Sequence, residues 1–166
     1  MNIFLIGFMG AGKTTLGKLV AEQLDYSFLD LDDLIEEREG RSVQEIFAQE
    51  GQQLFREKEH AALQATGDLH GQYLIACGGG TPCFHNNMSL INRLGTSVYL
   101  QTNPAELARR LIPYKSHRPL ISHIPDLELA SFISSLLSQR EEFYLQARLI
   151  LTSDNPSPDD LIALLR

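Results

Sequence analysis

The chain has 166 residues, enough for one domain, and its apolar and charged fractions of 43% and 21% are ordinary for a globular protein. A formal net charge of −7 excludes nucleic-acid binding by bulk positive charge, so nucleic acid is not an expected partner. Two cysteines, Cys77 and Cys83, are too few for a disulfide scaffold and lack zinc-ligand spacing, so reduced thiols in a cytoplasmic protein are expected.

The first residues are apolar but do not predict a membrane segment. Met1 to Phe8 is short, has no basic flank and leads directly into glycines, so neither a signal peptide nor a membrane span is expected. Ile3 to Ile6 predicts a strand buried on both faces. The apolar residues after Gly12 recur at helical spacing and predict a helix: Leu16, Leu19, Val20 and Leu24.

Strands and helices alternate along the rest of the chain. Four more apolar runs predict strands, over residues 26–31, 73–77, 97–100 and 148–151. Helices are predicted after a capping box at Ser42 and Glu45, over about 52–66, after Asn103-Pro104, over 127–147 and after Ser157, whereas 113–125 is predicted to be irregular. This alternation indicates an α/β fold with a parallel sheet covered on both sides, and ligands bind such sheets at the carboxyl ends of the strands.

The segment between the first strand and the first helix matches G-x-x-x-x-G-K-[ST], the P-loop pattern. Its glycines permit a turn in which backbone N–H groups face phosphates, and the following helix adds its positive end. Lys13 is expected to reach the β- and γ-phosphates, and the Thr14 hydroxyl to ligate Mg²⁺. A chance match in a chain this long is roughly one in 200 at ordinary glycine frequencies. The sequence therefore predicts a nucleotide site at Gly7–Thr14.

Other P-loop classes fit less well. A GTPase should carry a guanine-reading N-K-x-D, which is absent, and Asp68–Gly71 fits D-x-x-G but follows a polar helical stretch, so a loop is expected there. A large ATPase motor needs more chain. A small phosphotransferase remains.

Acidic residues follow the second predicted strand. Asp30 is placed to hold Mg²⁺ directly or through water, and Asp32 to accept a hydrogen bond from a substrate hydroxyl. The alternative is a helix N-terminus that carries acids, and this alternative is strongest for Asp33.

Glycines and arginines provide a third set of candidates. Three successive glycines, Gly78–Gly80, cost backbone entropy unless the backbone must approach something closely, and the Gly79 N–H is the candidate ligand contact. Arg56 and Arg140 lie within predicted helices and are weak signals alone.

Four basic residues occur between positions 109 and 118: Arg109, Arg110, Lys115 and Arg118. A cationic stretch bounded by prolines suits a lid over phosphates, and Arg118 is placed to neutralise charge on the transferred phosphoryl group. The alternative is a solvated basic loop.

Together these segments resemble the shikimate kinase family along essentially the whole chain. The matching runs are GFMGAGKTTLG, FLDLDDLIE, GRSVQEIF, FREKE, the Gly78–Gly80 triplet, HRPL and QREEFY. The P-loop is shared by a very wide class, whereas the D-x-D, F-R-x-x-E, G-G-G and R-P-L set is much more specific.

The resemblance implies ATP-dependent phosphorylation of the 3-hydroxyl of shikimate, a step of aromatic amino-acid biosynthesis. It implies a single kinase domain over 1–166 with the nucleoside-monophosphate-kinase fold, sheet order 2-3-1-4-5, substrate-binding helices at about 32–65 and a lid at about 112–125. ATP and Mg²⁺ would be bound by Gly10, Ala11, Gly12, Lys13, Thr14, Thr15, Asp30, Arg110 and Arg118. Shikimate would be bound by Asp32, Phe47, Phe55, Arg56, Gly78, Gly79, Gly80 and Arg140, with Lys13, Asp32 and Arg118 as catalytic residues.

Some alternatives stay open. Arg109 is a second candidate for the role given to Arg110 near the adenine, and residues 152–156 lack the basic residue that the family often carries there. Another small-molecule kinase of the same fold, for gluconate or a nucleoside monophosphate, and a kinase-like binding protein without turnover are the rival functions. No additional apolar stripe is evident, so a monomer without membrane partners is expected.

Overall fold

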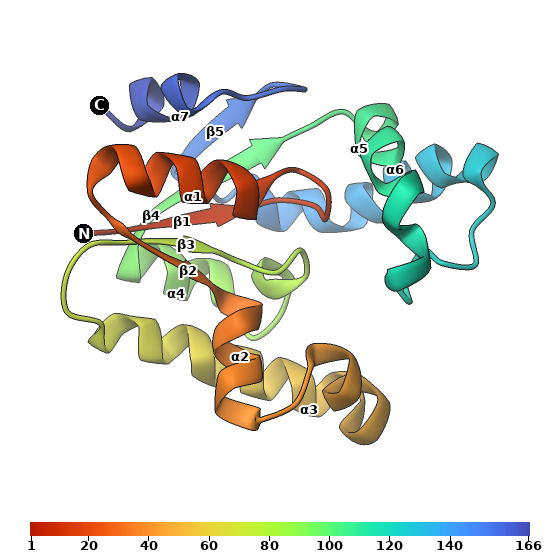
Figure 1. Ribbon diagram of the computed structural model, residues 1–166, viewed down its shortest axis with the longest axis horizontal. Coiled ribbons are helices and arrows are strands. Elements are labelled where there is room, and N and C mark those ends of the chain that lie inside the picture. Colours follow the sequence, from red (N-terminus) through yellow and green to blue (C-terminus); the bar gives the residue numbers. More distant parts are fainter.

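The computed structural model describes residues 1–166 and is built around a five-stranded parallel sheet in the order β2-β3-β1-β4-β5 (Figure 1). The central strand pairs through Phe4 with Ile75 on one side and with Ser97 on the other. This order confirms the one that the resemblance implied. The strands are β1 (Asn2–Ile6), β2 (Ser27–Asp30), β3 (Tyr73–Ala76), β4 (Gly95–Gln101) and β5 (Leu149–Thr152).

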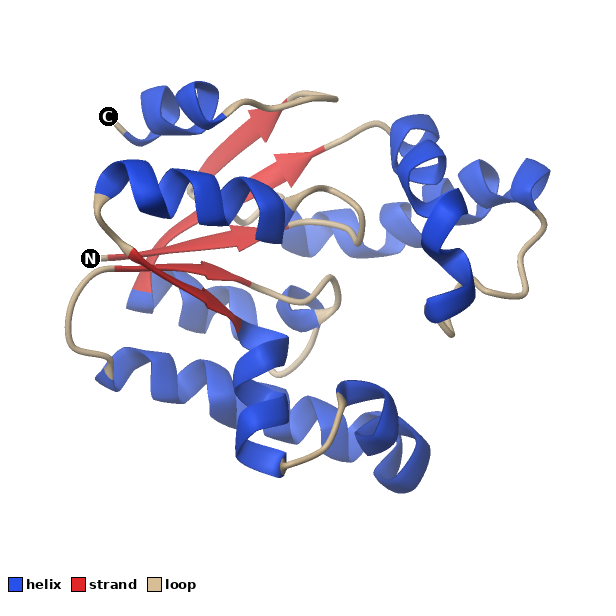
Figure 2. Cartoon of the chain, viewed as in Figure 1, coloured by secondary structure: helices blue, strands red, loops and turns tan.

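Helices cover both faces of this sheet, which confirms the three-layer α/β/α arrangement (Figure 2). Helices α1 and α7 lie on one face, and α4 and α6 lie on the other. No helix is both long enough and apolar enough to cross a membrane. The helices are α1 (Lys13–Leu24), α2 (Leu31–Glu39), α3 (Val43–Ala65), α4 (Asn87–Leu94), α5 (Pro104–Leu111), α6 (Asp126–Tyr144) and α7 (Pro158–Leu165).

The core lies between the sheet and these helices. Every residue of β1 is buried, because helices cover both of its faces, and this explains its continuous apolar run. Phe4, Leu5 and Ile6 have no exposed surface. Burial of these apolar side chains thus stabilises the strand that leads directly into the P-loop.

Helices α2 and α3 form a unit beyond the β2 edge of the sheet (Figure 1). The predicted capping box opens α3: the Ser42 hydroxyl accepts from the Glu45 N–H at 3.1 Å, and Glu45 accepts from the Ser42 N–H at 2.7 Å. Gly51 interrupts α3 with φ 80°, a conformation that glycine adopts without strain. The two predicted helical stretches before and after residue 51 are therefore two parts of one kinked helix.

Some predicted boundaries were wrong. Helix α4 was not predicted, since it has only eight residues and follows Asn86 without a side-chain cap. The segment expected to be irregular over 113–125 begins instead with a 3₁₀ helix, Ile112–His117. Leu19, which was assigned to the apolar face of α1, is 46% exposed, and α6 ends at Tyr144, before the predicted position 147.

Candidate active site

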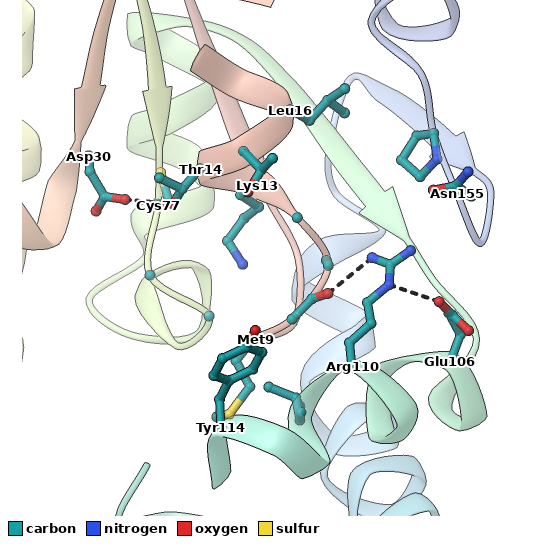
Figure 3. A pocket seen from close by; sticks show the side chains of 18 of the residues that line it. Met9, Lys13, Thr14, Leu16, Asp30, Cys77, Glu106, Arg110, Tyr114 and Asn155 are labelled. Atoms are coloured by element: carbon teal, nitrogen blue, oxygen red, sulfur yellow. Dashed lines mark hydrogen bonds and ion pairs between the residues drawn. The ribbon is translucent and has the colours of Figure 1, made fainter. Parts of the chain in front are cut away.

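A cavity of about 580 Å³ opens at the carboxyl ends of the strands, where the sequence predicted the chemistry (Figure 3). Its walls come from the P-loop, the ends of β2 and β3, helix α5, the segment with Tyr114 and Arg118, and the loop before α7. The predicted residues that line it are Gly10, Ala11, Gly12, Lys13, Thr14, Thr15, Asp30, Asp32, Gly78, Gly79, Arg110 and Arg118. The tertiary fold thus gathers most of the predicted nucleotide and hydroxyl contacts in one place.

The P-loop joins β1 to α1 and holds Lys13 inside the cavity. Gly10 and Gly12 have φ values of 82° and 91°, which a residue with a Cβ rarely adopts. The Lys13 ammonium donates to the carbonyls of Gly7 at 2.7 Å and Phe8 at 2.9 Å. Burial lowers the pKa of Lys13 to about 8, so the group is still mainly charged at pH 7. A cation therefore lies at the mouth of a turn suited to phosphate.

Thr14 and Asp30 lie side by side at the start of α1 and the end of β2. The Thr14 hydroxyl donates to Asp30 Oδ2 at 2.7 Å, and Asp30 Oδ1 accepts from the Asp32 N–H at 3.0 Å, which caps α2. Both groups present hard oxygens, the ligand type that Mg²⁺ prefers. The chain offers no group of three or more His, Cys, Asp or Glu side chains able to hold a metal by themselves. This pair fits a metal that takes most of its ligands from phosphates and water.

Asp32 lines the cavity and is a carboxyl whose pKa is raised well above its usual value. Burial, assisted by the nearby carboxylates of Asp30 and Glu59, raises the pKa of Asp32 to about 6, and Lys13 opposes this shift. A carboxylate with this pKa is ionised at pH 7 but holds a proton more strongly than an ordinary aspartate. It can therefore accept a hydrogen bond from an alcohol and receive its proton.

Arg109 and Arg110 both line the cavity, but their side chains contact different groups. Arg110 lies across the cavity, where its Nη1 donates to the Gly10 carbonyl at 3.1 Å and its Nη2 to the Asp154 carbonyl, while Nε pairs with Glu106 at 2.9 Å (Figure 3). The Arg109 side chain is 72% exposed and pairs only with Glu106. Arg110 is therefore the arginine that faces the P-loop. Asn155 and Pro156 also line the cavity, and the loop over residues 152–156 to which they belong contains no basic residue.

Arg118 follows the 3₁₀ helix Ile112–His117 and lines the same cavity. Its charge lies close enough to Lys13 to contribute to the lowered pKa of that lysine. Ile121 is fully buried and anchors the segment that follows Arg118, and the Lys115 ammonium donates to the Ile124 carbonyl at 2.7 Å. Residues 115–124 are therefore held together around the exposed Arg118.

Five predicted site residues are not among those that line the cavity: Phe47, Phe55, Arg56, Gly80 and Arg140. Arg56 lies among aromatic rings. Its guanidinium carbon is 4.3 Å from the ring centre of Phe84, 5.1 Å from that of Phe55 and 6.0 Å from that of Phe47. The rings of Phe47 and Phe55 are themselves 4.3 Å apart. The buried Glu59 carboxylate accepts from Arg56 Nη1 at 2.7 Å. These contacts hold the guanidinium plane in one orientation.

Arg140 approaches the same glycines from helix α6. A Cβ on Gly79 would lie 3.4 Å from Arg140 Nη1 and 3.3 Å from the Met9 nitrogen, and one on Gly80 would lie 2.9 Å from Arg56 Cζ. Gly79 and Gly80 therefore leave little room for a Cβ, because the P-loop and two guanidinium groups pack against them. Arg56 and Arg140 thus converge beside the loop that holds Lys13.

The charge around these glycines is unbalanced. Glu59 is the only carboxylate that forms an ion pair with either arginine. Arg56 Nε and Arg140 Nη1 are both buried without a hydrogen-bond partner. Unpaired buried donors on two cations are costly within the chain alone, and they suit an anionic ligand group that would accept from them.

Sequence reasoning gave no role to three residues of this region. Glu59 occurs in the F-R-x-x-E motif, and its i,i+3 spacing from Arg56 was a usable signal. Tyr144 donates to the Gly79 carbonyl at 2.6 Å, and Thr81 donates to Glu59 at 2.6 Å. The sequence around Tyr144 and Thr81 could not predict these two hydrogen bonds, because each bond joins separate elements.

Comparisons with known proteins agree with this geometry. Residues 9–165 match the family model described as Shikimate kinase. A curated shikimate kinase of Azobacteroides pseudotrichonymphae is 44% identical over 161 residues, which cover 97% of this chain and 95% of that protein.

Solved structures give the same result. The crystal structure of shikimate kinase from Bacteroides thetaiotaomicron superposes with a TM-score of 0.93 at 42% identity, covering 99% of this chain and 98% of that one. Shikimate kinase from Acinetobacter baumannii in complex with shikimate has a TM-score of 0.87 at 31% identity, covering 99% and 89%. A gluconokinase from Sinorhizobium meliloti, at 18% identity and a TM-score of 0.57, shares only the fold. This chain therefore belongs to the shikimate kinase family.

Proposed function

We propose that this protein transfers the γ-phosphoryl group of ATP to the 3-hydroxyl of shikimate, a step of aromatic amino-acid biosynthesis. The observation that carries the proposal is the convergence of Arg56 and Arg140 on Gly79 and Gly80, beside the P-loop. Shikimate has one carboxylate and three hydroxyls, and arginine can bond both oxygens of a carboxylate. Membership of the family supports this choice of acceptor.

The nucleotide would occupy the cavity with its phosphates on the P-loop. Lys13 would bind the β- and γ-phosphates, and the N–H groups at the start of α1 would add positive potential. Thr14 and Asp30 would hold Mg²⁺, which when bound neutralises charge on the phosphates. Arg110 would lie against the adenosine, and Arg118 of the lid would face the transferred phosphoryl group.

The acceptor would lie between Asp32 and the arginines. Asp32 would accept a hydrogen bond from the attacking hydroxyl, orient it, and take its proton late, since phosphoryl transfer needs mostly positioning and charge neutralisation. The carboxylate would bind Arg56 and Arg140 with the Gly79 N–H beside them, and Phe47 and Phe55 would form an apolar wall.

The lid at about 112–125 would close over both ligands. Its basic residues would approach the phosphates only when nucleotide is present, and closure would keep water from the γ-phosphate. We further propose that the enzyme is cytoplasmic, where Cys77 and Cys83 would stay reduced, and that it acts as a monomer. Sedimentation of the purified protein with and without ligands would test the monomer.

A coupled ADP-release assay tests the proposed acceptor. Purified protein with ATP and Mg²⁺ is given shikimate, gluconate or AMP in separate reactions. We expect release with shikimate only, since gluconate has no rigid ring and AMP needs a base pocket. Equal or greater release with gluconate would overturn the assignment, and no release with any acceptor would favour a binding protein without turnover.

A further inference from the structure

A chain of buried polar side chains runs behind Arg56, away from the ligand side. Thr81 and Asn87 have no exposed surface, and Glu59 is 1% exposed. The Thr81 hydroxyl donates to Glu59 Oε1 at 2.6 Å, and Glu59 Oε2 accepts from Arg56 Nη1 at 2.7 Å. Each carboxylate oxygen of Glu59 thus has its own donor.

Thr81 is itself held in place. The Asn87 amide donates to the Thr81 carbonyl at 2.8 Å, and Asn87 Oδ1 lies 2.6 Å from His60 Nδ1. The Thr81 N–H donates to the Gly78 carbonyl at 3.1 Å, at the start of a short 3₁₀ helix. The hydroxyl therefore sits at a fixed point of the fold, between helices α3 and α4.

The space around Glu59 leaves its carboxylate dependent on this hydroxyl. A Cβ on Gly78 would lie 3.0 Å from Thr81 Oγ1, 3.3 Å from Glu59 Oε1 and 3.3 Å from Asp32 Oδ1. Glu59 thus lies close to the carboxylate of Asp32 and raises its pKa. If Oε1 lost its donor, a buried carboxylate would have one unpaired oxygen and a reason to rotate towards other donors.

We propose that Thr81, seated by Asn87, is a positioning residue for the substrate carboxylate: its hydroxyl fixes Glu59, and Glu59 fixes the guanidinium of Arg56. The inference rests on the proposed function, because Arg56 is assigned to the carboxylate of shikimate. In addition, the geometry of the contact between Arg56 and the carboxylate depends on the Thr81 hydroxyl, which does not itself touch the substrate.

Two substitutions at one position isolate the hydroxyl. Thr81→Val keeps the shape of the side chain and removes the donor, whereas Thr81→Ser keeps the donor. Thr66→Val is the matched control, because Thr66 is also fully buried and its hydroxyl donates at 2.7 Å, but to the Leu63 carbonyl at the far end of α3. Steady-state kinetics are measured with shikimate varied at saturating ATP, and thermal unfolding is recorded for each variant.

We expect Thr81→Val to raise the KM for shikimate about tenfold or more, with kcat and the KM for ATP close to those of the parent protein. Thr81→Ser should restore most of the affinity. Thr66→Val should lower thermal stability without changing the KM for shikimate.

Three results would overturn the inference: an unchanged KM in Thr81→Val, an equal rise of KM in Thr66→Val, or no recovery in Thr81→Ser. If Thr81→Val does not fold, Thr81→Ser is compared with the parent protein and with Arg56→Met, which lacks the guanidinium. A KM for shikimate in Thr81→Ser as high as that in Arg56→Met would show that the hydroxyl is not sufficient, and would overturn the inference. Failure of the proposed function is separate, since the parent protein would then not turn over shikimate.

Discussion

Replacing Asp32 with asparagine should make the ligand-free protein more stable while it impairs turnover. The pKa of Asp32 is raised from 3.8 to about 6, first by burial and then by Asp30 and Glu59, so its ionised form is less stable in the folded chain than in the unfolded chain. The hydrogen bond that caps α2 uses the N–H of residue 32 and is kept. Asparagine has nearly the same shape and no charge to desolvate.

The size of the effect follows from this shift. One pKa unit corresponds to about 1.4 kcal/mol, and the shift is roughly two units, so the penalty on the folded state is at most about 3 kcal/mol. The side chain retains some contact with water, and we expect a gain of about 1–3 kcal/mol in the free energy of unfolding. For a chain of this size, this gain corresponds to about 2–4 °C in Tm per kcal/mol.

The pH dependence has a definite sign. Below pH 3.8 Asp32 is protonated in both states and the substitution should have no electrostatic effect. Between pH 3.8 and about 6 the folded state binds more protons than the unfolded state, so the parent protein loses stability as pH rises. The advantage of Asp32→Asn should therefore grow through this range and stay constant above it.

Urea unfolding, followed by circular dichroism at several pH values without ligands or metal, measures the difference. Asp68→Asn serves as the control, because Asp68 is exposed and remote from the cavity. In the same preparations, kcat for shikimate phosphorylation should fall sharply for Asp32→Asn. A variant that is no more stable than the parent at pH 8, or whose advantage does not vary with pH, would refute the reasoning. Near-normal turnover at saturation would remove the catalytic role.

Three further predictions concern the arginines and the lid. Arg140→Met should raise the KM for shikimate about tenfold or more without loss of stability, because Arg140 has no carboxylate partner in the chain; an unchanged KM in steady-state assays would place the carboxylate elsewhere. Arg110→Ala should raise the KM for ATP, whereas Arg109→Ala, with its side chain 72% exposed, should not; the reverse result would exchange their roles. Residues 113–125 should gain protection from hydrogen exchange when ADP and shikimate bind, and unchanged exchange there would contradict closure.

The nucleotide site could be predicted from the sequence because it is contiguous. Glycines, Lys13 and Thr14 occupy successive positions between a buried strand and a helix, and short-range geometry dictates that such a loop presents its N–H groups. The strand order followed from the family resemblance. Capping residues such as Ser42 and Glu45 were visible for the same reason as the P-loop, since their partners lie within a few residues.

The short helix α4 was missed because its signal is not local. It has no side-chain cap, follows a left-handed Asn86, and is stabilised by burying Met88, Leu90 and Ile91 against the rest of the fold. A helix of eight residues is too short to be predicted from intrinsic helix propensity, because its stability comes from packing.

Local sequence was enough to predict the P-loop, and it supplied the arginines and aspartates that suit a substrate with a carboxylate and hydroxyls. The tertiary structure decided which of them meet. Arg109 and Arg110 are neighbours on one helix, and only the packing of α5 shows which one reaches Gly10. Arg56, Arg140 and Thr81 come from separate elements, and they meet at Gly78–Gly80 because helices α3 and α6 both pack against the segment that follows β3.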